Sequence, residues 1–398
     1  MTGMAAGPAP HGAGGGWSRM AMGLARLQYN RQGGPSGDAA LESSNWSMVM
    51  AQRPWLSGTL TLMMMNSLEP ATFRDGGMPQ IFQTGETFEG RPLVDRQHPH
   101  DLFMNVSATW RRPIGERSAA WVQLAPVGEP ALGPTAFMHR ASSGENPAAP
   151  LSHHWHDSSH ITRSVITVGG AWRRFVLEGS TFHGREPDEG RWDIDGGAPD
   201  SYAARLKVRL GGGWSGQLSH AFLKNPETLS IGNARRHTAS LHYGAEGDRP
   251  LAASLVWGQN REVHGITDAV LAEAAWQLTA RDQLYGRAEY VEKESELLIN
   301  KGISEREQHG HEHGFAAVVR PSVPVGALTV GYLRSRDLFR SLNAGLGADV
   351  TVYQFGASLR PAYGDMPVST HVFLRLRWGR PHGGHAAGGD EAGGHQHH

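Results

Sequence analysis

Apolar and polar side chains alternate with a period of two along most of this chain, which is the pattern of a β-strand whose two faces meet different surroundings. The clearest segment is HVFLRLRW near the C-terminus. There Val372, Leu374 and Leu376 fall on one face, whereas Phe373 and Arg375 fall on the other. YAARLKVRL and LYGRAEYVE alternate in the same way. Because almost no segment has helical periodicity, we predict an all-β fold.

The connections between these segments alternate in length. Short turns such as RLGGGWS, GAEGDRPLA and LTARDQLY are separated by much longer polar loops. This alternation is typical of a transmembrane up-and-down antiparallel β barrel with its long loops at one end. We count roughly 17 candidate strands, but bacterial single-chain barrels normally have an even number, so we predict about 16–18. We therefore expect that one strand was missed or counted in excess, either in 68–100 or in 126–161. PQIFQTGE, in the first of these segments, is a candidate extra strand.

Aromatic residues near the predicted strand ends fit the girdles of a membrane barrel. The tryptophans with this placement are Trp17, Trp46, Trp110, Trp172, Trp214, Trp257 and Trp378. No apolar run approaches the roughly 20 residues of a membrane helix. A soluble β protein with its charged faces in water is the alternative, and it would stay in solution without detergent.

The chain divides into one barrel and two tails. We assign residues 17–379 to the barrel, 1–16 to a flexible Gly/Pro-rich segment and 380–398 to a flexible His/Gly-rich tail. The N-terminal segment has neither the basic nor the apolar region of a signal peptide.

The alternation also predicts which charged side chains point into the barrel. Both signs occur, so the lumen is either a water-filled channel or is closed by ion pairs, and the sequence favours neither. The predicted lumen residues are Glu178, Arg205, Lys207, Arg209, Arg287, Glu289, Arg375 and Arg377.

Charge and composition exclude several classes of protein. The net charge is −1, from 37 basic and 38 acidic residues, so nothing attracts a phosphate backbone and no nucleic-acid partner is expected. Cysteine is absent, which excludes disulfides, thiolate metal sites and cysteine nucleophiles.

Histidine is abundant, with 22 residues concentrated in long loops and in the tail. The densest stretch is SHHWHDSSH at 152–160. Imidazoles supported by carboxylates suit Cu, Zn or Ni, and Cu or Zn is the only cofactor that we expect. The alternative is that these polar residues pair with one another and pack the loops over the barrel mouth. The candidate metal ligands are His98, His100, His139, His153, His154, His156, Asp157, His160 and His183.

A hydrolase is a further alternative, because Asp157, Ser158, Ser159 and His160 supply the residue types of a catalytic triad. Sequence neighbours rarely point at one another, however, and there is no GxSxG pattern. We therefore expect that the protein is not an enzyme.

The phrases QTGETFEGRPLVDRQHPHDLF, APVGEPALGPTAFMHR, LSHHWHDSSHIT and FHGREPDEGRWD resemble a family of outer-membrane β-barrel proteins of Gram-negative bacteria that has no assigned activity. The resemblance runs from Trp17 to Trp378. It implies an outer-membrane location and, through the His/Met-rich termini of that family, a link to the handling of copper or other transition metals. This chain has only a sparse Met/His segment at its N-terminus.

From the residues and the resemblance together we predict an outer-membrane barrel that is a channel or a Cu/Zn-associated protein. A barrel hydrolase, or a passive structural porin with incidental histidines, are the alternatives. The expected partners are the lipid bilayer and transition-metal ions, and the oligomeric state stays open.

Overall fold

A computed structural model describes residues 16–227, 232–263, 265–300 and 321–379. Nearly all of the N-terminal segment and the whole His/Gly-rich tail, which we expected to be flexible, lie outside the described residues.

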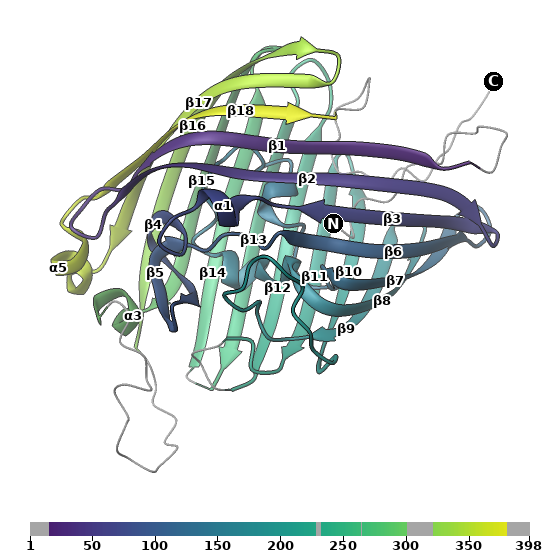
Figure 1. Ribbon diagram of the computed structural model, residues 1–398, viewed down its shortest axis with the longest axis horizontal. Helices are drawn as coiled ribbons and strands as arrows, with labels where there is room; N and C mark the ends of the chain where they lie inside the picture. The colour runs from purple at the N-terminus through teal and green to yellow at the C-terminus, as the bar shows by residue number, and fades with distance from the viewer. Residues whose placement is uncertain (1–15, 228–231, 264, 301–320, 380–398) are drawn as a thin grey trace.

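The wall is one closed barrel of 16 antiparallel strands, in which each strand pairs with its neighbours and β1 closes on β18 (Figure 1). The all-β barrel predicted from the alternation is therefore confirmed. The wall strands are β1 (Ser18–Arg31), β2 (Ala39–Trp55), β3 (Gly58–Asn66), β6 (Phe103–Pro113), β7 (Ser118–Gly128), β8 (Thr162–Trp172), β9 (Phe175–His183), β10 (Ser201–Gly211), β11 (Trp214–Leu223), β12 (Ala234–Ala245), β13 (Leu251–Glu262), β14 (Gly265–Gln277), β15 (Asp282–Glu294), β16 (Ser322–Phe339), β17 (Leu342–Phe355) and β18 (Val368–Trp378).

The odd strand count comes from a hairpin that is not part of the wall. β4 (Met78–Phe88), which contains PQIFQTGE, pairs only with β5 (Arg91–Gln97). Its register shifts twice, and Phe82, Glu86 and Asp95 have positive φ angles of 67°, 59° and 60°. Such bulges bend a strand and re-aim its side chains, so the hairpin folds over the barrel mouth instead of joining the sheet.

The two ends of the barrel differ. The short turns, such as those at 56–57, 173–174 and 212–213, lie at the end where β1 begins and β18 ends, and the long loops lie at the other. In Figure 1, β4, β5, α3 (Ser295–Asn300) and α5 (Arg360–Tyr363) are all at the loop end. In outer-membrane barrels the short turns are periplasmic and the long loops are extracellular, so for such a barrel we expect the long loops to face the cell exterior.

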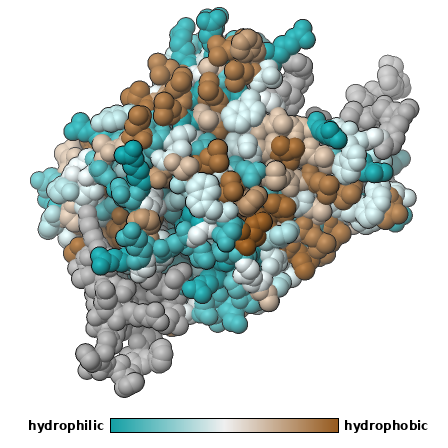
Figure 2. All heavy atoms as spheres, in the orientation of Figure 1, coloured by the Kyte–Doolittle hydropathy of each residue, from teal (hydrophilic) through white to brown (hydrophobic). Residues whose placement is uncertain are grey.

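The outer face of the wall carries many exposed apolar side chains, and Figure 2 shows apolar patches among polar residues on the side in view. Outward side chains such as Leu374 are exposed, whereas the inward Arg375 beside it is 1% exposed. Exposed aromatic residues lie near both ends, among them Trp172 and Trp214 at the short turns. Trp46 departs from our prediction, because it points inward against a methionine cluster and does not belong to a girdle. No helix among the described residues is long and apolar enough to cross a membrane.

The loop between β7 and β8, residues 129–161, folds into the barrel, and we call it the plug. It contains η1 (Phe137–His139), α2 (His153–His156) and η2 (Ser158–His160). Hydrogen bonds tie it to seven strands of the wall: Glu129 to Arg205 of β10, Gly133 to Ser219 of β11, Ser142 to Ser254 of β13, Arg140 to Glu273 of β14, Ala148 to Arg287 of β15, Glu145 to Arg375 of β18 and Gly144 to Arg26 of β1.

The predicted lumen residues lie on the inward face, and most of them take part in ion pairs. Arg205 binds Glu178 at 3.0 Å, and Arg375 and Arg377 bind Glu145 of the plug at 2.6 and 2.9 Å. The other contacts are Lys207 to Glu178, Arg287 to Glu289, and Arg209 to the main-chain oxygen of Arg173. The lumen is thus filled at the loop end. Near the short turns inward side chains such as Met20 and Met22 are only half-buried.

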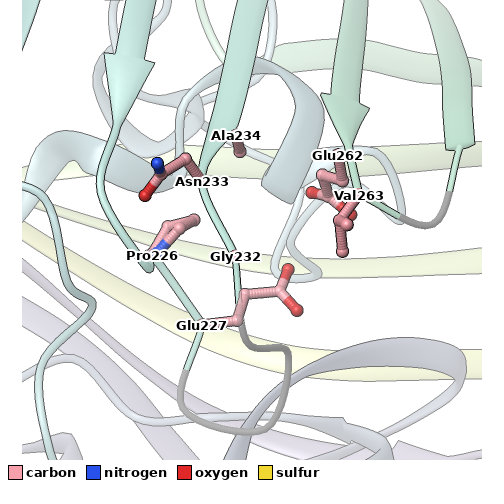
Figure 3. Close-up of a pocket in the computed structure, with 7 residues that line it drawn as sticks. All are labelled: Pro226, Glu227, Gly232, Asn233, Ala234, Glu262 and Val263. Atoms are coloured by element: carbon pink, nitrogen blue, oxygen red, sulfur yellow. The ribbon is translucent and has the colours of Figure 1, made fainter. Parts of the chain in front are cut away.

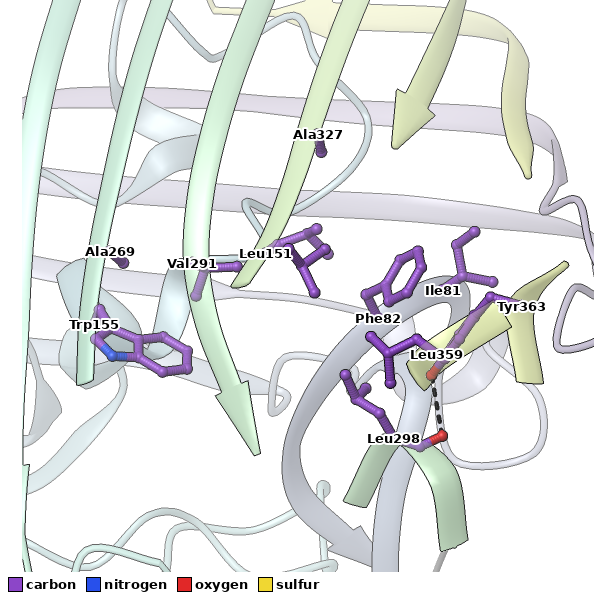
Figure 4. Close-up of a cluster of buried hydrophobic side chains, with 11 residues drawn as sticks. Ile81, Phe82, Leu151, Trp155, Ala269, Val291, Leu298, Ala327, Leu359 and Tyr363 are labelled. Atoms are coloured by element: carbon purple, nitrogen blue, oxygen red, sulfur yellow. Dashed lines mark hydrogen bonds between the residues drawn. The ribbon is translucent and has the colours of Figure 1, made fainter. Parts of the chain in front are cut away.

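A buried apolar cluster fixes the β4–β5 hairpin to the mouth of the barrel (Figure 4). Phe82 of β4 stacks on Tyr363 of α5 with ring centres 4.0 Å apart. The Tyr363 hydroxyl donates to Asp95 of β5 and to the main-chain oxygen of Leu298 in α3. Two further short helices complete the mouth: α1 (Glu69–Thr72) and η3 (Ala357–Leu359).

The lipid-facing side of the wall can be tested with one charge. Leu374→Arg places a guanidinium on the apolar face of β18, where Leu374 is 46% exposed. We expect a loss of about 2–4 kcal/mol in the free energy of folding into lipid vesicles, measured by urea titration. Met366→Arg is the control, because Met366 is 86% exposed in the loop before β18. Equal losses in the two variants would contradict the assignment of this face to lipid.

Candidate functional site

Five histidines from two loops meet at the outer end of the lumen. His98 and His100 follow β5, whereas His153, His154 and His160 belong to the plug. His160 is the centre of the group, with its ring 5.2 Å from the rings of both His100 and His153. His153 lies 5.5 Å from His154, and His154 lies 5.9 Å from His98. We call these five residues the histidine cluster.

Each ring in the histidine cluster is held through Nδ1 by an oxygen that can only accept a hydrogen bond. The partners are Pro99 O for His98 at 3.2 Å, Glu69 Oε2 for His100 at 2.7 Å, Asp157 Oδ1 for His153 at 2.7 Å, Glu186 Oε1 for His154 at 3.2 Å and Asp157 O for His160 at 2.7 Å. Nδ1 must therefore carry the proton, which leaves a lone pair on Nε2 in the neutral ring.

All five Nε2 atoms are buried and have no hydrogen-bond partner. A buried polar atom without a partner is rare and needs a physical reason. Two of these atoms are obstructed. His98 Nε2 lies 3.2 Å from Glu86 Oε1, and His154 Nε2 lies against Gly85, where a Cβ would be only 2.3 Å away. The unobstructed Nε2 atoms are those of His100, His153 and His160.

Burial lowers the pKa of His153, and it lowers the pKa of both His98 and His160 well below the usual range, with the positive charge of Arg191 adding to the effect at His98. These three imidazoles are therefore held in the neutral form. A neutral imidazole is the form that binds a metal ion.

Asp157 anchors the cluster to the barrel wall. Its carboxylate accepts from His153 Nδ1 and, at 2.8 Å, from Arg140, which in turn binds Glu273 of β14 at 2.5 Å. Burial alone would raise the pKa of Asp157, but Arg140 and His153 outweigh it and hold the pKa well below its usual range. Asp157 thus stays charged and orients His153.

The loop between β9 and β10 covers the cluster from outside. Its Arg191 binds Asp101 at 3.0 Å and also binds Glu86. Glu186 of the same loop holds His154. Four separate segments of the chain therefore build this site: α1, the hairpin region, the plug and this covering loop.

No three His, Asp or Glu side chains among the described residues form a ready-made coordination shell, so an ion would require the rings to turn toward one another. The ring spacing is nevertheless suitable. Two imidazoles that bind one tetrahedral ion at about 2.0–2.1 Å have ring centres roughly 5 Å apart. The spacing of His160 to His100 and to His153 is 5.2 Å.

Besides Asp157, which holds His153, three of the candidate ligands lie outside the histidine cluster. His156 points at the wall, with Nε2 3.3 Å from the main-chain oxygen of Ala269 in β14. His139 packs edge-on against Trp46, and His183 bonds to the main-chain oxygen of Ala198 at the outer surface. Density of histidine in the sequence located the cluster but could not separate these residues from it. Glu69 and Arg140 were missed, because an isolated Glu or Arg in a loop gives no signal.

The serine residues of the hydrolase alternative are paired elsewhere. Arg236 donates to the hydroxyls of Ser158 and Ser159 at 2.9 and 3.3 Å. His160 Nδ1 donates to the main-chain oxygen of Asp157 and not to its carboxylate. These four residues therefore do not form a proton relay.

A small pocket lies at the loop end between the segment after β11 and the end of β13 (Figure 3). Glu227 and Glu262 line it together with Pro226 and Val263. None of the five residues of the histidine cluster lines it, so the pocket is separate from that cluster.

Comparison with known proteins supports the fold. No protein-family profile and no curated protein sequence matches the chain. Among solved structures, a loop-deletion mutant of OmpT, an outer membrane protein of Vibrio cholerae, has a TM-score of 0.54 at 10% identity, covering 91% of this chain and 99% of that one. OmpF of Salmonella typhi has a TM-score of 0.53 at 9% identity, with coverages of 90% and 97%. An anion-selective porin of Comamonas acidovorans has a TM-score of 0.50 at 11% identity, with coverages of 91% and 100%.

These comparisons correct one expectation. From the sequence we expected that the protein is not an enzyme, but the similar structures include OmpT beside the porins. A likeness at 9–11% identity shows the fold alone. The exclusion of an enzyme is therefore withdrawn.

The closed 16-strand wall, its apolar outer face and its likeness to these barrels lead to one conclusion. The protein is an outer-membrane β-barrel of the Gram-negative type.

Proposed function

We propose that this outer-membrane barrel binds a divalent transition-metal ion, Zn(II) or Cu(II), through Nε2 of His100, His153 and His160. The observation that carries the proposal is the shared state of these rings. Each Nδ1 is held by an acceptor oxygen, and each Nε2 is buried without a partner.

The surroundings of the three rings support this reading. Metal-binding histidines generally donate their other ring N–H to a carboxylate or a main-chain oxygen, which fixes the ring and raises its basicity. Glu69 and Asp157 supply such oxygens here. Nitrogen donors without thiolate favour Zn(II) or Cu(II) over softer ions. The site faces the long loops, so the ion would arrive from the cell exterior.

A channel role has its own support. A wall of 16 strands is wide enough for water and ions when nothing fills it, and the similar structures include porins. In this chain the plug occupies that space, so we propose capture of the ion at the outer end instead of free flow.

The metal site is tested by titration of the detergent-solubilised full chain with Zn(II) and Cu(II). In His153→Ala/His160→Ala we expect affinity to fall roughly 100-fold or more, because even changes behind a ligand reduce affinity 10–100-fold. His183→Ala/His237→Ala is the matched control and should bind like the parent. All chains carry serine in place of the tail histidines, so that the tail does not contribute.

Folding of each variant is checked by its heat-modifiable migration on a gel. If folded His153→Ala/His160→Ala bound Zn(II) and Cu(II) as tightly as the control, the proposal would be contradicted.

A further inference from the structure

The inner face of the barrel carries a grid of methionines on three adjacent strands. Each strand has methionine at alternate positions, in RMAM, SMVM and MMM, so these side chains share one face of the sheet. The strand register aligns them into two rows. One row is Met20, Met50 and Met63, and the other is Met22, Met48 and Met65.

Two further methionines extend the grid. Met104 of β6 and Met138 of the plug pack against it, and we call the packed group the methionine cluster. Met48, Met65 and Met104 are 1–2% exposed, whereas the others are half-buried. Its methionines are Met20, Met22, Met48, Met63, Met65, Met104 and Met138.

Packing alone does not explain this concentration. Methionine is flexible and specifies a core poorly, so proteins use it sparingly to fill gaps. The other three apolar clusters among the described residues consist of Ala, Val, Leu, Ile and aromatic side chains and contain no methionine. This one contains 7 of the 13 methionines in the chain. It also lies on the inner face of a membrane barrel, which is normally polar.

The methionine cluster adjoins the histidine cluster on its periplasmic side. Ile161, the residue after His160, packs into it, and Met138 follows Phe137, whose ring is 5.4 Å from that of His153. In β2 the main-chain N–H of Asn45 donates to Glu69, which also holds His100. Met48 and Met50 follow Asn45 along β2 toward the short turn. The two clusters are therefore consecutive along the lumen.

An unpartnered nitrogen also lies beside the methionine cluster. His139 is adjacent to Met138, its ring centre is 4.7 Å from that of Trp46, and Trp46 packs against the same methionines. The Nε2 atom of His139 is buried and has no hydrogen-bond partner.

We propose that the methionine cluster is a second binding site, for a soft monovalent cation such as Cu(I) or Ag(I), held by thioether sulfur. Thioethers are soft ligands that select Cu(I) over harder ions. They are neutral, so they can stand in an apolar environment without the desolvation penalty of a charged ligand. The site uses none of the five imidazoles of the histidine cluster. This proposal can therefore be tested independently of the divalent site proposed above.

Ag(I) is the probe, because it is soft, monovalent and stable to air. The full chain, labelled with ¹³C at the methionine methyl groups, is titrated with Ag(I) in detergent and observed by NMR. We expect the methyl signals of Met22, Met48 and Met65 to shift first and together. Met64 is the internal control, because it lies between Met63 and Met65 on the same strand but is 43% exposed on the lipid side. If the methyl signals of the methionine cluster shifted at no lower Ag(I) concentration than the signal of Met64, the proposal would be overturned.

Substitution gives an independent readout. Met22→Leu/Met48→Leu/Met65→Leu keeps the apolar volume, a change that cores tolerate well, so the barrel should fold. We expect Ag(I) affinity to fall roughly tenfold or more, equivalent to about 1.4 kcal/mol, while Zn(II) binding stays at the parent value. Met64→Leu should change neither, and His153→Ala/His160→Ala should retain the Ag(I) event. Parent-like Ag(I) binding by the folded triple leucine variant would mean that the methionines only pack.

Discussion

Removal of the plug should raise the ion conductance of the barrel by an order of magnitude or more. Replacing residues 129–161 by Asn-Gly is feasible because Gly128 and Thr162, at the two ends of the plug, are register partners, and a two-residue turn of this type joins paired strands. Without the plug, a 16-strand wall leaves an aqueous channel. The measurement is single-channel current in planar bilayers, and the parent should conduct little.

The plug variant should also prefer anions. Glu145 leaves with the plug, so Arg375 and Arg377 of β18 lose this carboxylate, and the inner face of β18 becomes more positive. A reversal potential in a KCl gradient measures this preference. Shortening the covering loop at 187–196 is the control, because that loop lies at the mouth and does not cross the lumen. If the folded plug variant conducted no more than this control, wall side chains and not the plug would close the lumen.

The wall of the barrel could be predicted from the sequence because the pleat has a fixed period of two. In HVFLRLRW each residue faces either lipid or lumen, and the alternation of Leu374 with Arg375 records that difference directly. The miscounted strand had the same local pattern. PQIFQTGE does form a strand, but alternation says nothing about which partner a strand pairs with. The positive φ angles at Phe82 and Glu86, which remove it from the wall, occur at residues that do not favour them.

The site was predictable in part. Histidine density identified SHHWHDSSH and the HPH segment at 98–100, and the structure brings most of these rings together. Which of them meet depends on how two loops fold into one barrel, and that is a tertiary property. His156 shares a helical turn with His153, yet it faces β14. The acceptor oxygens that orient the rings, such as those of Glu69, come from segments with no distinctive pattern.

The methionine cluster was overlooked for a different reason. RMAM, SMVM and MMM each read as ordinary alternating strand segments. Only the register between β1, β2 and β3 places six thioethers in two rows. The alternating methionines are visible in the sequence, but their grouping on one face of the sheet can be recognised only when the pairing of the strands is known.

Loss of one buried guanidinium should release the plug from the wall. Arg140 is the only cation that contacts both Asp157 and Glu273 among the described ion pairs, and all three side chains are at most 4% exposed. Arg140→Met removes the shared arginine of two buried carboxylates and leaves Glu273 with Arg287 at 3.5 Å and Asp157 with His153. Breaking a buried ion pair by removing one partner typically costs about 3–5 kcal/mol. Because the 16-strand hydrogen-bonded wall is unaffected, we expect the loss to appear mainly as local opening of the plug.

The opening is measured by hydrogen exchange and by limited proteolysis of residues 129–161, which should both become much faster. Arg334→Met is the control, because Arg334 pairs with Asp282 at 3.1 Å but its side chain is 63% exposed, and such surface pairs contribute little to stability. In Arg140→Met the Asp157 carboxylate also loses its fixed position, so His153 should turn more freely and Zn(II) affinity should fall as well. If the plug exchanged as slowly in Arg140→Met as in Arg334→Met, its apolar and main-chain contacts would be enough to hold it in place without this ion pair. Packing, and not the ion pair, would then fix the geometry of the histidine cluster.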